Sequence, residues 1–549
     1  MGVSSWWRKL QGAIEGPVAW LVAVLVFWAC AMRNLEAPGI YMDAINPDYL
    51  VARWLSPALE NPAWVMPGPT MPWLGNLYHG TQTFWFGLLT YGFLGTSVSS
   101  ARITHALFGA FLVLLAWLVV RRASGRPWLA LAAATGLATD MAFLGSFRTQ
   151  AYIILAGQVW MMLAFYLAIR ATAERGTRVP VLLSGVGMGL AAYGYFIFLF
   201  FLPVVALLAV LGPGRTGAAR RSALWAAGFV IGMLPYVLGY VLLAVDVGGV
   251  GPFIEWMHNA VTGLKPTQGS SSYLQGLSSA FDNARLALSG GGNELMMTGT
   301  VVSSGWPTWR AAVFAVAGVV CVGGALRERH ENPPMAAVLL ASAALPVVFI
   351  AVAAWFGSRM WAHHFTVLVT LGYVLVGMAA SWLHLRLRRS GTRILGGAGV
   401  LLAGLWLAGN LAQQQQVHHR LAATGGSGMS TDAMSAMARA ALTERWSAAW
   451  YFPDWGFFMP FAFLTGNQVA YEIETTPAAL GRHRGTRDGV RVAFWKAADR
   501  ERHTAFLQEN GVHDIRHYVL LTRDGQPAIH VLAGSMERPV DPPAGSAQP

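Results

Sequence analysis

Long apolar runs recur along most of the first 412 residues, and they constrain the fold more than any other feature of the chain. A helix that crosses the hydrocarbon core of a bilayer needs about 20 mainly apolar residues. Eleven runs approach this length, and they begin near residues 16, 101, 127, 150, 180, 196, 222, 308, 334, 361 and 394. The sequence therefore predicts a polytopic α-helical membrane protein with about eleven transmembrane helices. The fifth and sixth runs are nearly fused, and we expect a short turn near Tyr193, Gly194 and Tyr195 to separate them.

The composition agrees with a membrane protein. Hydrophobic residues make up 55% of the 549 residues and charged residues 12%, about half the charge of an average soluble chain. The net charge of +12 is interpreted as an excess of arginine in cytoplasmic loops. A nucleic-acid-binding surface is not indicated, because the sequence contains no soluble module in which basic and aromatic residues alternate. Cys30 and Cys321 both lie in apolar runs and indicate neither a disulfide framework nor a metal site. No small-residue cleavage site follows the first run, so we expect an uncleaved anchor.

Arginine clusters follow alternate runs and indicate how the chain is oriented. Positive residues are enriched in cytoplasmic loops, so this alternation predicts a cytoplasmic N-terminus and a periplasmic or extracellular C-terminus in the cytoplasmic (inner) membrane. It also favours an odd number of spans. The basic residues that carry the argument are Arg8, Lys9, Arg121, Arg122, Arg126, Arg170, Arg175, Arg178, Arg215, Arg220, Arg221, Arg327, Arg329, Arg386, Arg388, Arg389 and Arg393.

Three segments are then predicted on the outer side. Residues 33–100 are rich in Pro and Trp and end in "TQTFWFGLLTYGFLG", which we expect to form an interfacial helix. Residues 245–307 are rich in Gly and Ser and predict a long mobile loop, of the kind that often serves as a lid. The predicted domains are therefore a transmembrane domain over 1–412 and a soluble extracytoplasmic domain over 413–549.

The tail alternates between helix and strand patterns, which predicts a small α/β domain. The stretches "AWYFPD", "QVAYEIE", "VRVAFW" and "HYVLLTR" are typical of strands. The stretches "TDAMSAMARAALTERW" and "ADRERHTAFLQENG" are typical of helices. The last ten or so residues, rich in Pro, Gly and Ser, are expected to be disordered.

Two acids follow the first apolar run, in "YMDAINPDYL". We expect Asp43 near the outer lipid–water boundary, where it is a candidate catalytic carboxylate. Asp48 precedes the helical pattern "YLVARWL", where a carboxylate is favoured by the helix dipole. The structural alternative is that Asp43 caps a short helix and Asp48 faces water.

Basic residues at the predicted outer ends of the spans run against the general charge pattern. Several arginines that converge at one surface suit an anionic headgroup, because a guanidinium binds phosphate through a fork of donors. The alternative is that each side chain extends along the lipid to reach headgroups. The residues of this set are Arg102, Arg148, Arg359, His79, His363 and His364.

In these motifs the chain resembles the GT-C class of membrane glycosyltransferases, of the protein O-mannosyltransferase and aminoarabinose-transferase type (glycosyltransferase families 39 and 83). "YMDAINPDYLVARWL" offers Asp43, Tyr49 and Ala52-Arg53 for the family's first motif. "YHGTQTFW" gives His79 and Trp85, and Arg102 opens a similar second span. "LGSFRTQAYIIL" resembles the segment before the fourth span. The resemblance covers roughly residues 15–410 and is most specific in 40–170.

The resemblance implies sugar transfer from a polyprenyl-phosphate donor to a lipid, glycan or protein acceptor, with inversion. It implies Asp43 as base, with Asp48 as a second catalytic candidate. Arg102, Arg148 and Arg359 would bind the donor phosphate, and His79, Tyr49, His363 and His364 would bind substrate. No cofactor is predicted with certainty, and a divalent cation stays open.

Two positions depart from the family pattern. Ala44 replaces the acid that usually follows Asp43, and Gln150 stands near a position that is often acidic. The first alternative function is a transporter or lipid flippase. This alternative predicts charged groups within the spans, and Asp140 is the clearest example. A structural or assembly protein whose tail recruits partners is the second, and it leaves the outer Arg and Asp residues unexplained.

Overall fold

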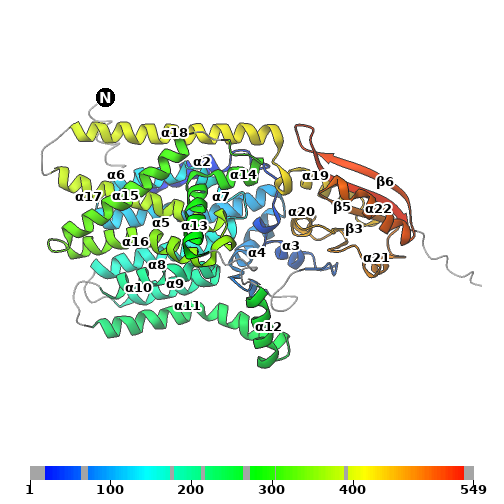
Figure 1. The fold of residues 1–549 in the computed structure, drawn as a ribbon, viewed down its shortest axis with the longest axis horizontal. Coiled ribbons are helices and arrows are strands. Elements are labelled where there is room, and N and C mark those ends of the chain that lie inside the picture. Colours follow the sequence, from blue (N-terminus) through cyan, green and yellow to red (C-terminus); the bar gives the residue numbers. More distant parts are fainter. Residues whose placement is uncertain are drawn as a thin grey trace, which may run out of the picture. The chain divides into compact units, whose positions relative to one another are not determined.

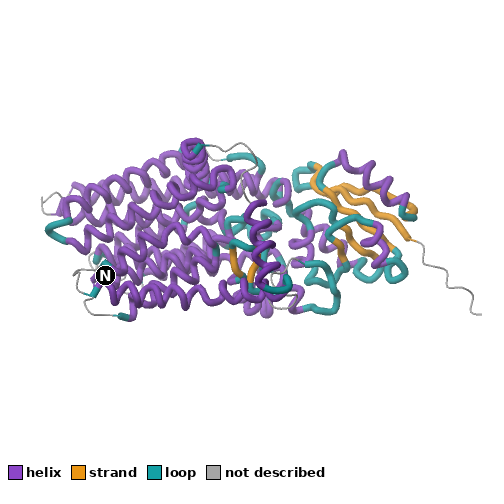
Figure 2. Tube along the Cα trace, turned by 60° about the horizontal axis from the view of Figure 1, so that its bottom comes forward, coloured by secondary structure: helices purple, strands orange, loops and turns teal. Residues whose placement is uncertain are grey.

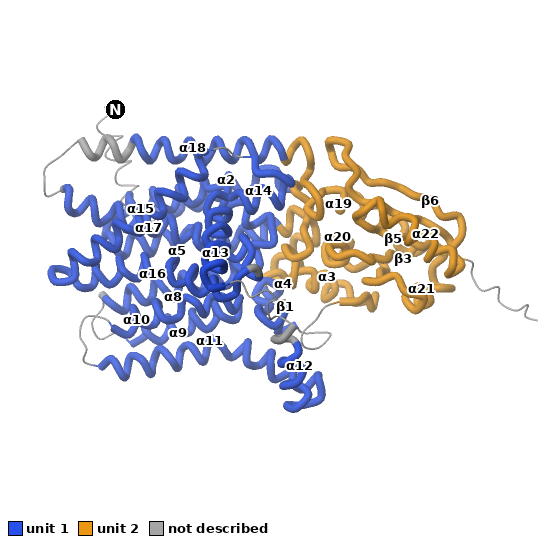
Figure 3. The backbone as a smooth tube through the Cα atoms, viewed as in Figure 1, with its two compact units in different colours: residues 1–35, 65–85, 102–420 blue, residues 36–64, 86–101, 421–549 orange. Residues whose placement is uncertain are grey.

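The computed structural model describes residues 16, 19–63, 72–173, 178–211, 217–263, 272–302, 305–388 and 394–536. The chain divides into two compact units (Figure 3). Unit 1 comprises residues 1–35, 65–85 and 102–420, and unit 2 comprises residues 36–64, 86–101 and 421–549. The last boundary between the units falls at 420/421, inside α18 (Ile394–Thr424), where the sequence predicted 412. Unit 2 also takes in two pieces of the segment predicted as the first outer loop.

Unit 1 is a bundle of packed helices (Figures 1 and 2). Helices lie at all eleven predicted positions: α2 (Trp20–Ala31), α5 (Val98–Ser124), α6 (Pro127–Ala138), α8 (Tyr152–Ala173), α9 (Val179–Gly194), η2 with α10 (Phe196–Phe201, Leu202–Val210), α11 (Ala218–Asp246), α15 (Trp306–Glu328), α16 (Pro333–Phe356), η4 with α17 (Ala362–Thr366, Val367–Arg388) and α18.

Within the described residues, six of these helices are long and apolar enough to cross a membrane. They are α5, α8, α11, α15, α16 and the helix that includes α17. The helices α2, α6, α9 and η2–α10 are apolar but shorter. The chain is therefore a mainly helical membrane protein, and the number of eleven spans stays a prediction.

Helices α9 and α11 pack with their backbones in direct contact through glycines spaced four apart. A Cβ at Gly185 would lie 2.1 Å from the Trp225 carbonyl oxygen, and one at Gly228 would lie 2.1 Å from the Leu182 carbonyl oxygen. Small residues at this spacing let membrane helices approach closely. The glycines of these two helices therefore set the packing on this side of unit 1.

Two breaks in the helices lead to the candidate site. Helix α9 ends at Gly194 and η2 begins at Phe196, which confirms the predicted turn near Tyr195. Helix α6 ends at Ala138, and Asp140 then caps the short helix α7 (Met141–Ser146). The chain passes from α7 through residues 147–151 into α8.

The predicted mobile loop over 245–307 is wrong for the described residues, which form α12 (Val250–Gly263), α13 (Tyr273–Ser289) and α14 (Gly291–Thr298). Helix α13 begins at a capping box formed by Ser272 and Gln275, and it packs against α16. Its alanines recur at helical spacing and are buried, a periodicity that the surrounding Gly and Ser residues obscure. Residues 264–271 and 303–304 lie outside the described residues.

Unit 2 contains a five-stranded sheet in the order β4-β3-β5-β7-β6. Strand β3 is parallel to β4 and β5, and β7 is antiparallel to β5 and β6. The elements are α19 (Ala433–Thr443), β3 (Ala448–Tyr451), α20 (Phe458–Leu464), β4 (Tyr471–Glu472), α21 (Pro477–His483), β5 (Gly489–Phe494), α22 (Arg500–Glu509), β6 (Val512–Leu521) and β7 (Pro527–Met536), with short 3₁₀ turns η5 (Gly428–Ser430) and η6 (Ala497–Asp499).

Strands β3 to β6 and helices α19 and α22 fall on the stretches singled out in the tail, whereas β7, α20 and α21 were not predicted. The core consists of apolar side chains from the sheet and from α21 and α22, among them Val492, Leu480 and Leu507. The predicted disordered end falls on residues 537–549, which lie outside the described residues.

The N-terminal pieces of unit 2 are tied to its sheet by polar side chains. The amide of Asn61 donates to the carbonyl oxygen of Val469 at 2.9 Å, and its oxygen accepts from the backbone N–H of Tyr471 at 3.0 Å. These contacts extend the edge at β4 and explain why residues 36–64 belong to this unit. The remaining elements are η1 (Met42–Ala44), α3 (Tyr49–Leu55), the hairpin of β1 (Leu74–Asn76) and β2 (His79–Gly80), α4 (Gln82–Leu94) and η3 (Gly357–Arg359).

Candidate active site

The nine residues predicted for the site are divided between the two units. Unit 2 holds Asp43, Asp48 and Tyr49, and unit 1 holds the others, which are His79, Arg102, Arg148, Arg359, His363 and His364.

Three predicted substrate-binding histidines of unit 1 form one cluster around Tyr195, the residue at the break between α9 and η2. The ring of His79 stacks on that of Tyr195 with a centroid distance of 5.8 Å. The Tyr195 hydroxyl lies 3.1 Å from Nε2 of His364. The ring of His363 lies 3.9 Å from that of His364. Three segments that are far apart in the sequence and lie outside the long helices therefore bring these side chains together.

Backbone groups hold the ring nitrogens of two of these histidines. Nδ1 of His364 lies 3.0 Å from the backbone nitrogen of Trp361 and 3.3 Å from its carbonyl oxygen, so this ring nitrogen is held by the Trp361 backbone while Nε2 faces Tyr195. Nδ1 of His79 lies 3.0 Å from the Gly80 carbonyl oxygen, which can only accept, so it is protonated. Burial lowers the pKa of His79 to about 4. At neutral pH His79 is therefore uncharged and suited to hydroxyl groups more than to an anion.

The segment Phe147–Gln150, between α7 and α8, contacts several of the predicted residues. The Phe147 carbonyl oxygen accepts from Nη1 of Arg102 at 3.2 Å and lies 3.3 Å from Nδ1 of His105. The Gln150 amide lies 2.8 Å from Nδ1 of His363. This one segment thus links the arginine of α5 to the histidine cluster.

Arg148 lies in the same segment, and its guanidinium caps the end of α2. It donates to the carbonyl oxygens of Asn34 and Ala31, each at 2.9 Å, and to that of Arg33. The last carbonyls of a helix have no partner within the helix, and a cation there is also favoured by the dipole. Burial lowers the pKa of Arg148 to about 10, which leaves the side chain charged at neutral pH.

Neither arginine extends along the lipid to the headgroups, because Arg102 and Arg148 are each 3% exposed. That alternative is therefore wrong for both residues. Arg359 ends the short turn η3 and is partly exposed. The phosphate-binding role of the three arginines stays a prediction.

Asp43 of unit 2 lies in the 3₁₀ turn η1 and keeps part of its surface exposed. Burial of the rest raises the pKa of Asp43 above its usual value, while a hydrogen bond from Tyr41 opposes the shift. The Tyr41 hydroxyl in turn accepts a hydrogen bond from Trp455. Asp43 is thus an oriented and accessible carboxylate.

Asp48 has the opposite environment. Its side chain is fully buried, so the alternative that it faces water is wrong. The Tyr91 hydroxyl donates to Oδ2 of Asp48 at 2.7 Å. Asp48 does occupy the N-cap position of α3, as the helix pattern predicts, although its side chain makes no capping hydrogen bond.

Tyr49 is also buried, at 1% exposure, and its ring packs edge-on against Phe458 at 5.8 Å. Helix α3 packs on α20 at this contact. The aromatic contact accounts for Tyr49 as a core residue of unit 2.

Sequence reasoning missed Tyr195 and Asn293. Tyr195 stands at the predicted turn but is not distinguished there from other aromatic residues near span ends. Asn293 lies in the segment predicted as a mobile loop, yet it is 5% exposed and contacts α7. Within the described part of the chain, no group of three or more His, Cys, Asp or Glu side chains is arranged to hold a metal ion.

Apolar helices of spanning length, with histidines and arginines where they begin or end, are those of a polytopic membrane protein. No known protein-family profile and no curated protein sequence matches the chain. The fold is similar to that of ArnT from Cupriavidus metallidurans bound to undecaprenyl phosphate. The TM-score is 0.58 at 12% identity, over 94% of this chain and 98% of that one.

The fold is also similar to that of the Archaeoglobus fulgidus oligosaccharyltransferase in complex with Zn and sulfate. Here the TM-score is 0.50 at 13% identity, over 95% of this chain and 74% of that chain.

Proposed function

We propose that this protein is a glycosyltransferase that moves a sugar from a polyprenyl-phosphate donor to an acceptor on the outer side of the cytoplasmic membrane. The observation that carries the proposal is the fold shared over nearly the whole chain with a protein bound to undecaprenyl phosphate. The presence of buried arginines and neutral histidines within unit 1 agrees with it. The donor lipid would lie among the apolar helices, and its phosphate would meet cationic side chains.

The reaction requires a base and fixed donors for the departing phosphate, and the candidate residues supply groups for both. A base must accept the proton of the attacking hydroxyl, and we assign this role to Asp43. The departing phosphate must be stabilised by fixed donors, a role for Arg102 and Arg148 with Arg359 as a third candidate. Direct attack of one nucleophile on the anomeric carbon inverts its configuration.

Asp43 is preferred to Asp48 because the two carboxylates differ in accessibility. Asp43 is partly exposed, and its raised pKa makes it a better proton acceptor than an ordinary aspartate. Asp48 is closed off and hydrogen-bonded to Tyr91. Tyr49 supports α3 from within the core.

The histidine cluster is assigned to the sugar. His79 is uncharged at neutral pH, and its ring stacks on that of Tyr195. Neutral donors and acceptors next to aromatic rings suit the hydroxyl groups and apolar face of a sugar ring. His363 and His364 extend the same polar surface.

The experiment that tests the function compares the cell envelope with and without the gene by mass spectrometry. We expect one envelope component to lose the mass of one sugar, and wild-type protein to restore it. The purified protein, given that component and a radiolabelled polyprenyl-phosphate sugar, should then form product with the anomeric configuration inverted. An unchanged envelope, together with no transfer by the purified protein, would refute the proposal.

A further inference from the structure

The segment Phe147–Gln150 contacts several residues of the candidate site in unit 1. The helix α7 that precedes the segment is too short to hold it in place. Helix α7 has only six residues, and all six are buried. A helix of this length has no appreciable stability of its own. The position of the segment must therefore come from contacts with neighbouring elements.

One side chain, Asn293 of α14, contacts both ends of α7 and the segment itself. Its amide nitrogen donates to the Ala142 carbonyl oxygen at 2.8 Å and to the Ser146 hydroxyl at 3.1 Å. Its oxygen accepts from the Thr149 hydroxyl at 2.9 Å. Asn293 thus fixes the segment relative to the start of α7.

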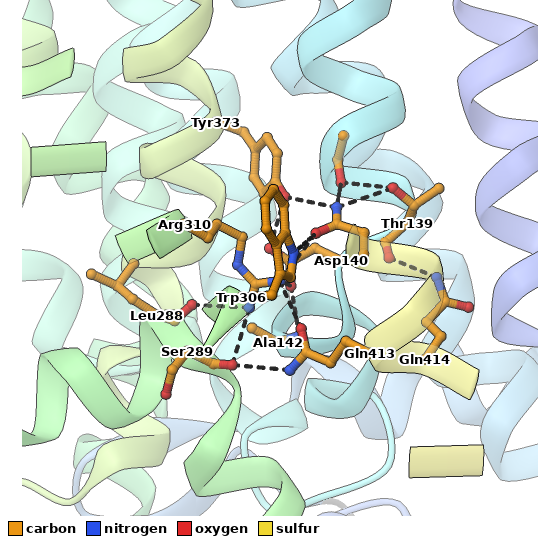
Figure 4. A network of polar contacts seen from close by, with 12 residues as sticks. Thr139, Asp140, Ala142, Leu288, Ser289, Trp306, Arg310, Tyr373, Gln413 and Gln414 are labelled. Carbon is orange, nitrogen blue, oxygen red and sulfur yellow. Dashed lines mark hydrogen bonds and ion pairs between the residues drawn. The ribbon is translucent and has the colours of Figure 1, made fainter. Parts of the chain in front are cut away.

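The start of α7 is fixed by Asp140. Its Oδ1 accepts from the Ala142 backbone N–H at 2.7 Å and lies 2.9 Å from Nη1 of Arg310, and both charged side chains are completely buried (Figure 4). The Tyr373 hydroxyl donates to Oδ2 at 2.8 Å. The carboxylate is therefore held by donors from α7, α15 and α17.

Arg310 connects this cap to α13, α14 and α18. It donates to Oε1 of Gln413 at 2.9 Å and to the carbonyl oxygen of Ser289 at 3.0 Å (Figure 4). Gln413 passes the connection on, because its amide donates to Glu294 at 2.8 Å. Glu294 is the neighbour of Asn293 in the sequence. The same network therefore connects Asn293 and Asp140, the two side chains that position α7.

We propose that Asn293, Thr149 and the buried Asp140–Arg310 pair are positioning residues that hold Phe147–Gln150 in place and thereby align Arg102 and His363. The catalytic consequence of this proposal rests on the proposed function. A buried ion pair is weak evidence for stability alone, because a well-packed apolar pair is often as stable. Its hydrogen bonds to the start of α7, to α13 and to α18 are what an apolar pair does not reproduce.

The first measurement reports geometry and needs no activity. Gln150→Cys and His363→Cys are introduced together after Cys30 and Cys321 have been replaced by Ser, and a short bis-maleimide, which adds to one thiol at each end, is mixed with the purified protein. Both positions are partly exposed, and their native side chains lie 2.8 Å apart. We expect rapid cross-linking, and loss of most of the product when Thr149→Val or Asp140→Leu/Arg310→Met is added.

The second measurement is transfer by single variants that keep Gln150 and His363. Thr149→Val should lower kcat by up to about 10²-fold, the cost of a misplacement of about 1 Å, and raise KM much less. Thr149→Ser keeps the hydroxyl and should restore both activity and cross-linking. The matched control is Thr172→Val, because Thr172 is equally buried but bonds only within α8, to the Ile169 carbonyl oxygen.

Undiminished cross-linking in both Thr149→Val and the Asp140→Leu/Arg310→Met pair would overturn the positioning role. An equal loss in Thr172→Val would also overturn it, because the effect would then be general destabilisation. If cross-linking responds as expected but wild-type protein transfers no sugar, the proposed function fails while the positioning of the segment stands.

Discussion

At the scale of single residues, the two acids near the start of the chain differ in what surrounds them. Asp43→Asn keeps the size of the side chain but removes the proton acceptor. We expect kcat to fall by about 10²-fold or more, with little change in donor affinity. The measurement is transfer rate and donor binding in purified protein. Asp524→Asn, at an exposed acid in a turn of unit 2, is the matched control.

The pH dependence follows from the same carboxylate. Burial raises the pKa of Asp43, and a base must be ionised to act, so kcat/KM should rise as the pH increases through that raised pKa. Asp43→Asn should lack this limb of the profile. A full limb in the Asn variant would show that another group is the base.

Asp48 is predicted to affect stability and not catalysis. Tyr91→Phe removes the hydroxyl that donates to the buried Asp48 carboxylate. Loss of a donor to a buried acceptor costs about 1–3 kcal/mol of the free energy of unfolding. Thermal unfolding should show this loss, and kcat of the folded protein should stay unchanged. A fall in kcat without a change in stability would place Asp48 in the reaction.

At the scale of elements, the helices were predictable and the connections were not. Apolar runs predict the helices, and the polar and small residues between two of these runs predict the break at Tyr195. The role of Asn61 has no local signature, because its partner Val469 lies 408 residues away. Helices α13 and α14 were missed because Gly and Ser in the surrounding segment outweigh a short apolar period.

The candidate site was predictable to the same extent. His79, His363 and His364 stand out as polar residues at the ends of apolar runs, and the structure brings them together. Tyr195 and Asn293 do not stand out, because an aromatic residue near a span end and an Asn in a polar segment are both common. Their importance comes from contacts between distant elements.

The buried pair Asp140–Arg310 allows a test at this scale. Arg310→Met leaves the Asp140 carboxylate buried without its charged partner, which should cost about 3–5 kcal/mol of the free energy of unfolding. Asp140→Leu combined with Arg310→Met should recover most of that loss, because no charge remains unpaired. Thermal unfolding of the two variants in detergent checks this. Equal destabilisation in both would mean that packing, and not charge, dominates.

The same pair bears on the transporter alternative. A transporter needs intramembrane charged groups that exchange partners during the transport cycle. Asp140 is instead held by Arg310, Tyr373 and the start of α7, each within 2.9 Å. The charged group that most favoured transport is thus part of a fixed internal network, which agrees better with an enzyme whose helices provide a rigid frame.

At the scale of the whole molecule, the orientation in the membrane that the arginine pattern predicts can be tested by labelling. Single cysteines are introduced after Cys30 and Cys321 have been replaced by Ser, and a membrane-impermeant thiol reagent is added to intact cells. Gly481→Cys in α21 should be labelled, because the tail is predicted on the outer side and a Cβ there meets no atom within 4 Å. Ala219→Cys, exposed at the start of α11 beside Arg220 and Arg221, should be labelled only after the membrane is opened. Labelling of Ala219→Cys from outside would show that the predicted orientation is reversed. It would also remove the basis for a reaction on the outer side, because the same charge pattern assigned Asp43 and the arginine loops to opposite sides of the membrane.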